Sequence, residues 1–171
     1  MSKKRIALIS TGGTIEKTYC ELHGVLDNQE SVLDVVLAGL RLGGVEIVRV
    51  PLLNKDSLDM TERDHALISQ TAMSMAEAHD GVVIVHGTDR LEVSGLHLVA
   101  HHDTPPVPIV FTGAMRPYML RNTDALQNLT EALLAVQVLQ AGVYCVIHNK
   151  VLTFPDVRKD KQQGTFVRRD G

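Results

Sequence analysis

The sequence predicts an α/β fold, with a mostly parallel sheet covered by helices on both faces. Short apolar runs alternate with longer segments of helical spacing along most of the 171 residues. Such alternation joins parallel strands through helical crossovers. The run at 81–85 (GVVIV) is continuous and β-branched, which is typical of a strand buried on both faces. We expect one domain over residues 1–171.

The chain begins with a strand and a turn. Residues 5–10 (RIALIS) form a short apolar run, and the glycine pair 12–13 interrupts it. Residues 16–30 are polar, contain Gly24 and show neither a two-residue nor a helical period. We therefore expect a strand over 5–10 and an irregular loop over 16–30.

A helix and a second strand are predicted next. From Ser31 the apolar residues recur on one helical face until the glycine pair 43–44, which is expected to end the helix. The run 45–50 (VEIVRV) has strand character. Pro51 follows it and is expected to end the strand, because proline lacks the N–H that a sheet ladder uses.

The middle of the chain predicts two helices around the most apolar strand. Thr61 and Asp64 have the spacing of a capping box, with Asp in place of the usual Glu. They open a helix that continues to about Met75, and the strand 81–85 follows. A further helix is expected over 91–101.

The last third repeats the pattern and then weakens. Pro105 and Pro106 form a turn before a strand at 107–111, and the long amphipathic segment 123–140 precedes a strand at 143–147. After residue 150 we expect a charged tail with one short strand, 165–168.

Composition excludes several classes of function. The net charge is −3, and three Tyr, three Phe and no Trp leave few groups for base stacking. Nucleic acid and anionic membranes are therefore not expected partners. The apolar run at 6–9 is too short for a signal peptide, and no run approaches a membrane span. Cys20 and Cys145 form no zinc or disulfide pattern. We expect a soluble, cytoplasmic protein.

Hydroxyls, glycines and one carboxylate gather in the turns that follow the predicted strands. Ligands bind beyond the carboxyl ends of parallel strands, so these turns are expected to form one small-molecule site. A glycine pair alone would indicate only a tight turn, and the phosphate-binding loops and the GxSxG elbow are absent. A threonine activated by Lys or Tyr is the nucleophile left to consider. The turns are 11–15 (TGGTI), 53–57 (LNKDS), 86–89 (HGTD) and 112–117 (TGAMRP).

Several motifs, in this order, resemble the bacterial L-asparaginase family of threonine-dependent amidohydrolases. TGGTI together with HGTD is specific to that family, although either alone is weak. The resemblance implies the α/β fold of the family's N-terminal domain. The matching segments are 11–15 (TGGTI), 57–60 (SLDM), 81–95 (GVVIVHGTDRLEVSG), 110–117 (VFTGAMRP), 122–124 (NTD) and 156–159 (DVRK).

The resemblance implies catalytic roles residue by residue. Thr14 matches the nucleophile that forms the acyl-enzyme, and Tyr19 matches the residue that activates it from a mobile lid. Thr88, Asp89 and Lys159 match the family's second Thr–Lys–Asp constellation. There Thr88 addresses the scissile amide or the attacking water.

The resemblance also implies how substrate is held and what is made. Gly13, Ser57, Thr88 and Asp89 match substrate-binding positions, with Ser57 on the α-carboxylate and Asp89 on the α-amino group. The Ala114 backbone matches part of the oxyanion site. The implied reaction is hydrolysis of L-asparagine to L-aspartate and ammonia through a threonyl ester, without cofactor or metal. Homo-oligomerisation is also implied, since these sites are usually completed near a subunit interface.

Two departures from the family's pattern leave alternatives open. Leu58 stands where the long enzymes usually place Gln or Glu. The chain stops at Gly171, whereas those enzymes carry a second domain, so it resembles a short one-domain branch or a piece of a longer chain. Glutamine or another amino-acid amide is an alternative substrate. The alternative from another class is a non-catalytic, amino-acid-binding or regulatory domain.

Each candidate also has a purely structural interpretation. Asp89 and Glu92 have capping-box spacing. Tyr19 could be an ordinary surface tyrosine, and Lys159 lies in a run of charges that is typically solvated. His97 and His101 at i, i+4 could pair on a metal, but the sequence offers no third ligand.

Overall fold

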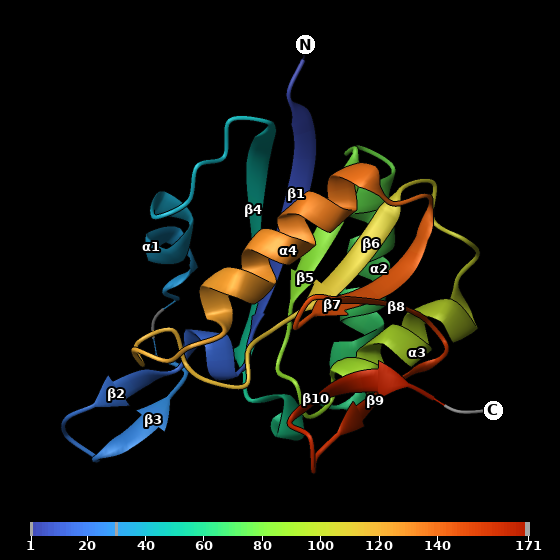
Figure 1. Cartoon of the computed structure of the whole chain (residues 1–171). Helices are drawn as coiled ribbons and strands as arrows, with labels where there is room; N and C mark the ends of the chain where they lie inside the picture. Colours follow the sequence, from blue (N-terminus) through green and yellow to red (C-terminus); the bar gives the residue numbers. More distant parts are fainter. Residues whose placement is uncertain (1, 30, 170–171) are drawn as a thin grey trace.

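The computed structural model describes residues 2–29 and 31–169, with a six-stranded sheet at the centre in the order β4-β1-β5-β6-β7-β8 (Figure 1). Neighbouring strands are parallel from β4 through β7, and β8 runs antiparallel to β7. The strands are β1 (Lys4–Gly12), β4 (Val45–Lys55), β5 (Gly81–Val85), β6 (Pro108–Thr112), β7 (Gly142–Ile147) and β8 (Lys150–Thr153).

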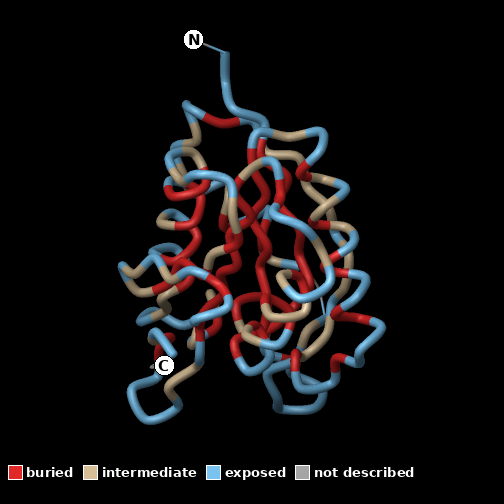
Figure 2. Tube along the Cα trace, turned by 90° about the vertical axis from the view of Figure 1, so that its right-hand side faces the viewer, coloured by how far each residue is buried: buried red, intermediate tan, exposed pale blue. Residues whose placement is uncertain are grey.

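Helices cover both faces of this sheet. Helices α1 (Leu33–Ala38) and α4 (Ala125–Val138) lie on one face, and α2 (Glu62–Ala76) and α3 (Leu91–His101) lie on the other. Within β1, Leu8 packs with the α1 and α4 side chains, whereas Ile9 packs with those of α2 and α3. Buried residues follow the central strands in Figure 2. The predicted α/β class is confirmed.

Local sequence signals account for several of these elements. The Thr61 side chain accepts a hydrogen bond from the Asp64 amide, and Asp64 accepts one from the Thr61 amide at 2.8 Å, which completes the predicted capping box. Strand β5 is wholly buried, as its apolar run predicts. Helix α3 has the predicted bounds. Within residues 2–29 and 31–169, no helix is long and apolar enough to cross a membrane.

The expectation of an irregular loop over residues 16–30 is wrong for 16–27, and residue 30 lies outside the described residues. A short 3-10 helix (Thr14–Glu16) leads into an antiparallel hairpin of β2 (Thr18–Cys20) and β3 (Val25–Asp27). Gly24 turns the hairpin at φ +65°, a backbone conformation that glycine adopts easily. The hairpin projects from the body of the protein (Figure 1). Strands of three residues are too short to show a period.

Two predicted ends are also wrong. Pro51 does not end its strand, because β4 is at the sheet edge and Pro51 lies opposite Ser10 within the ladder. Proline is tolerated there, where one side of the strand needs no partner. Helix α1 stops at Ala38 rather than at the glycine pair 43–44, and Gly39 caps it.

The region after residue 150 is structured rather than a charged tail. Strand β8 is the edge strand of the sheet next to β7. Strand β9 (Val157–Asp160) pairs with β10 (Thr165–Arg168) in a hairpin, in which Phe166 lies opposite Lys159. Val157 and Phe166 are buried in the main core. These two apolar anchors hold the hairpin against the sheet.

The strand order identifies the edge where a ligand would bind. The chain passes from β1 to β4 on one side and then reaches β5 on the other side of β1. In open α/β sheets, ligands bind beyond the carboxyl ends of the strands at this change of direction. The predicted TGGTI and HGTD turns follow β1 and β5, so the fold places both at that point.

Candidate functional site

The turns after β1 and β5 touch through their backbones. Gly13 has φ 84° and ψ −175°, a conformation that is almost restricted to glycine. A Cβ atom on Gly13 would lie 2.4 Å from the Cα of Gly87. The Thr11 hydroxyl also ties the two strands, donating to the Val85 carbonyl at 2.8 Å. The glycine pair is therefore a tight turn and the point where two turns of the site meet.

Two more of the predicted turns join at the same place. A Cβ atom on Gly113 would lie 2.3 Å from the carbonyl oxygen of His86 and 3.4 Å from Cγ2 of Thr88. A Cβ atom on Gly87 would lie 2.6 Å from Oγ of Ser57, whose side chain is buried. The glycines thus allow four separate turns to approach within van der Waals contact.

Lys159 is brought to this edge by the β9–β10 hairpin. Its ammonium donates to Oγ1 of Thr88 at 2.8 Å and to Oδ1 of Asp89 at 2.7 Å. Its backbone N–H donates to Glu92 at 3.1 Å. The Lys159 side chain is only 14% exposed, so it is not part of a solvated charge run.

Asp89 does not cap the following helix. The residue before α3 is Arg90, and no side chain caps it. Instead Asp89 pairs with Lys159 while its side chain stays 38% exposed. An ionised carboxylate accepts several hydrogen bonds, so Asp89 can also receive an amino group from a ligand.

The candidate nucleophile and its predicted activator belong to different elements and make no direct hydrogen bond. Thr14 opens the 3-10 helix next to Gly13 and is partly buried. Tyr19 lies on β2, is 53% exposed, and its hydroxyl is 3.9 Å from the position of a Cβ on Gly24. In the described part of the chain, no hydrogen bond joins Tyr19 to Thr14. The structure therefore brings together Gly13, Ser57, Thr88, Asp89 and Lys159, and Ala114 follows Gly113 in the fourth turn, whereas Tyr19 makes no hydrogen bond with them in the described residues.

Sequence reasoning missed a buried carboxylate next to Thr14. Glu16 is 1% exposed, accepts from the Gly12 amide at 3.1 Å, and receives the Ser31 hydroxyl. Burial raises the pKa of Glu16 above its ordinary value, although Ser31 and Arg49 oppose that shift. Glu16 holds the glycine turn in place. A charged residue in a polar segment gave no signal of this role.

A buried histidine precedes the HGTD glycine. His86 Nδ1 lies 2.8 Å from the Gly87 carbonyl, and Nε2 lies 2.7 Å from Oγ of Ser94. A carbonyl only accepts, so Nδ1 carries the proton. Burial lowers the pKa of His86 to about 4, and the ring is therefore neutral at pH 7. Ser94 also contacts His65 Nδ1 at 2.7 Å.

His97 and His101, the two histidines at i, i+4 on α3, contact each other and Ser69. The rings of His97 and His101 stack with their centroids 4.1 Å apart, and His97 Nδ1 lies 2.9 Å from Oγ of Ser69.

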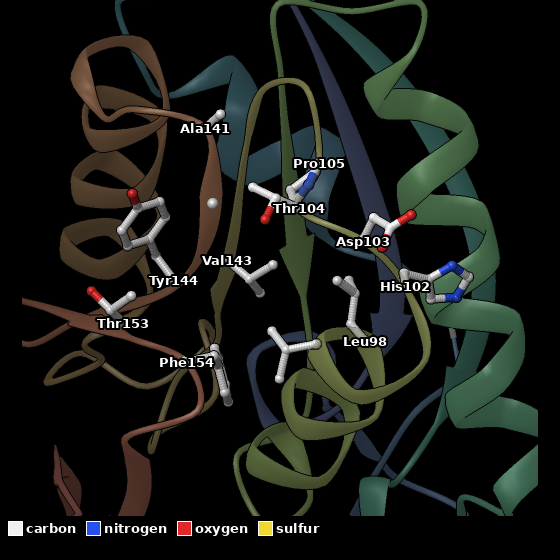
Figure 3. A pocket seen from close by; sticks show the side chains of 12 residues that line it. Leu98, His102, Asp103, Thr104, Pro105, Ala141, Val143, Tyr144, Thr153 and Phe154 are labelled. Carbon is white, nitrogen blue, oxygen red and sulfur yellow. The ribbon is translucent and has the colours of Figure 1, made fainter.

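A separate pocket of about 280 Å³ lies among Leu98, Thr104, Val143 and Phe154 (Figure 3). It opens near the amino end of β7, at the edge opposite the turns described above. It is not part of the candidate site.

These features define an α/β protein with a Thr–Lys–Asp cluster, its candidate site, at the carboxyl edge of a parallel sheet. The family model described as "Asparaginase, N-terminal" matches residues 5–166. The L-asparaginase of Thermococcus kodakarensis is 31% identical over 157 residues, covering 91% of this chain and 47% of the relative. The chain belongs to the asparaginase family, as its motifs indicate.

Solved structures agree with this assignment. The thermostable L-asparaginase from Thermococcus kodakarensis superimposes with a TM-score of 0.87, over 96% of this chain and 51% of that one. A probable cytoplasmic L-asparaginase from Campylobacter jejuni, 29% identical, gives 0.81 over 97% and 52%. A further sequence relative, the glutaminase-asparaginase of Acinetobacter glutaminasificans, is 26% identical over 174 residues, covering 92% of this chain and 50% of the relative. The chain spans about half the length of these relatives.

Proposed function

We propose that this protein hydrolyses the side-chain amide of L-asparagine to L-aspartate and ammonia through an ester on Thr14. The observation that carries the proposal is the contact of Lys159 with both Thr88 and Asp89, at 2.8 and 2.7 Å, beside the Gly13 turn. Membership of the asparaginase family and the likeness to enzymes named L-asparaginase support the same reaction.

The proposed reaction has two steps. The Thr14 hydroxyl attacks the amide carbon, the C–N bond breaks, and ammonia leaves with the hydroxyl proton. Water then cleaves the ester and returns a proton to Thr14. Thr88 and Lys159 act on the departing nitrogen and on the attacking water. Once the β2–β3 hairpin moves toward Thr14, the Tyr19 hydroxyl accepts the Thr14 proton while its own proton passes to the departing nitrogen.

The same proposal assigns the binding groups. Asp89 receives the α-amino group, since its carboxylate is partly exposed beside Lys159. Ser57 binds the α-carboxylate, and the backbones of Gly13 and Ala114 stabilise charge on the amide oxygen. No cofactor takes part in this scheme.

We also infer that the protein is a cytoplasmic homo-oligomer. Its likeness to an enzyme described as a probable cytoplasmic L-asparaginase supports the location. A subunit interface near the site would complete it, as the resemblance implies. The oligomer is tested by sedimentation of the purified protein with and without asparagine.

The decisive experiment measures ammonia release and traps the ester. Wild-type protein quenched with asparagine should gain the mass of one aspartyl group on the peptide that contains Thr14. Thr14→Ala should lose both the adduct and the turnover while unfolding at the wild-type temperature. Thr130→Ala is the matched control, because Thr130 lies on the exposed face of α4 and its hydroxyl donates to the Leu126 carbonyl of the same helix.

The outcomes separate the alternatives. An adduct on another residue, or full turnover by Thr14→Ala, would refute the nucleophile. Asparagine binding without ammonia release would favour a non-catalytic binding or regulatory domain. A panel of free amino-acid amides, glutamine included, decides which substrate is preferred.

A further inference from the structure

A hydrogen-bonded cluster behind the site fixes the turn that contains Ala114. Asp124, just before α4, accepts the backbone N–H of Met115 and that of Arg116, each at 3.0 Å. Asn128 donates to the Gly113 carbonyl at 2.9 Å and to Asp124 at 2.9 Å. The peptide groups on both sides of Ala114 are therefore held by residues at the start of α4.

The remaining donor to Asp124 is His148, from the turn between β7 and β8. His148 Nε2 lies 2.7 Å from Oδ2 of Asp124, and its backbone N–H donates to Asn128 at 3.1 Å. Burial raises the pKa of Asp124, but the Met115 amide and the His148 ring outweigh it and keep that pKa below its ordinary value. Because an ionised carboxylate only accepts, Nε2 of His148 must carry a proton.

His148 and Asn149 form the two-residue turn that joins β7 to β8. The φ of His148 is 50°, and His148 and Asn149 are the two non-glycine residues of the described chain with positive φ. A two-residue turn between antiparallel strands needs positive φ at both central positions, and histidine and asparagine adopt this conformation more readily than most residues. The turn places the His148 ring beside the start of α4 and the first residue of β10.

The other ring nitrogen reaches the hairpin that carries Lys159. His148 Nδ1 lies 2.8 Å from Oγ1 of Thr165, the first residue of β10. The next residue, Phe166, pairs with Lys159 across the hairpin, and Lys150 donates to the Phe166 carbonyl at 3.1 Å. His148 therefore contacts both the support of the Ala114 turn and the strand that pairs with Lys159.

We infer that His148 is a positioning residue that sets the Ala114 turn and the Lys159 hairpin relative to each other. The inference rests on the proposed function, because both ends act on the amide during its hydrolysis. Ser57, which receives the substrate's α-carboxylate, lies on another segment, and Asp89 lies on the turn after β5, although it also pairs with Lys159. Loss of the His148 bridge should therefore slow turnover more than it weakens binding.

Solvent reaches this bridge through a small pocket. The pocket has a volume of about 230 Å³, and its lining includes Arg116, Asp124, His148 and Gly164. The His148 and Asp124 side chains are 25% and 15% exposed. A substitution on the hairpin side of the ring can therefore be accommodated without opening the main core.

The test removes one hydroxyl and then restores it. Thr165→Val keeps the shape of Thr165 but cannot bond the ring, and kcat should fall about 10- to 100-fold while KM stays within about threefold. Thr165→Ser should recover most of kcat. His102→Gln, a histidine outside the cluster, is the control and should match wild type. Amide NMR signals of Met115 and Arg116, on the far side of His148, should move in Thr165→Val only.

Each outcome bears on the inference. Wild-type kcat and unmoved Met115 and Arg116 signals in Thr165→Val would overturn it. So would a loss of kcat that merely follows the loss of folded protein, or one that Thr165→Ser does not recover. If wild type releases no ammonia, the proposed function fails, and the NMR signals alone decide: movement supports the bridge and its absence overturns it.

Discussion

Replacing Gly13 by alanine should break the contact between the first two turns of the site. Gly13 adopts φ 84° and ψ −175°, and forcing a Cβ into this region costs on the order of 1–3 kcal/mol. The new atom would also lie 2.4 Å from Gly87 Cα and 2.5 Å from Gly87 N, which are backbone atoms that cannot rotate away. The two turns must then separate, and Thr14 moves relative to Thr88.

Gly13→Ala should lower both the unfolding temperature, measured by calorimetry, and the rate of ammonia release. A loss of about 1–3 kcal/mol lowers the unfolding temperature by about 2–12 °C for a domain of this size. Activity should fall about 100-fold or more, because a displacement of about 1 Å between reacting groups has that effect. The matched control is Gly43→Ala, whose Cβ would meet no atom within 4 Å. If Gly13→Ala unfolds and turns over like Gly43→Ala, the close approach of the turns is not required.

Three further outcomes are expected. Lys159→Met should lower kcat by about 10² to 10⁴, the scale of general acid–base catalysis. Arg158→Met, at the exposed neighbouring position, should change kcat little, and steady-state assays compare the two variants. Leu58, 60% exposed, cannot bond a charged head group, so Leu58→Gln should lower KM about 10- to 100-fold at similar kcat, and an unchanged KM would place the head group elsewhere. The pKa of His86 is about 4 in the folded protein and 6.5 in the unfolded chain. At pH values between these two, the chain therefore takes up a proton when it unfolds. The free energy of unfolding should therefore fall by about 3 kcal/mol from pH 6.5 to pH 4, and denaturant titrations should show this contribution missing in His86→Phe.

The layered core was predictable from local patterns. Continuous apolar runs predicted β1 and β5, and the Thr61–Asp64 spacing predicted the start of α2, because each depends on neighbouring residues. The hairpin of β2 and β3 and the edge position of Pro51 were not predictable. Three-residue strands have no measurable period, and a proline's tolerance depends on which strand lies at the sheet edge.

The site was predictable only where a motif carries the chemistry. TGGTI and HGTD indicated Thr14 and Thr88, and the fold brings their turns into contact at Gly13 and Gly87. Lys159 was indicated only by the match of 156–159 (DVRK) to the family, because a run of charges is otherwise typical of a solvated surface, and the β9–β10 register places it at the site. His148 was missed because its partners Asp124 and Thr165 lie 24 and 17 residues away in the chain.

The distance along the chain between Thr88 and Lys159 also has a consequence for synthesis. The two residues are 71 positions apart, and their side chains meet only after β9 has been made. At about 5–20 residues per second, translation takes roughly 4 to 14 s to pass from one to the other. During that interval the nascent chain carries the HGTD turn without its lysine. Amide hydrolysis in a coupled translation reaction should therefore begin only after Lys159 has left the ribosome.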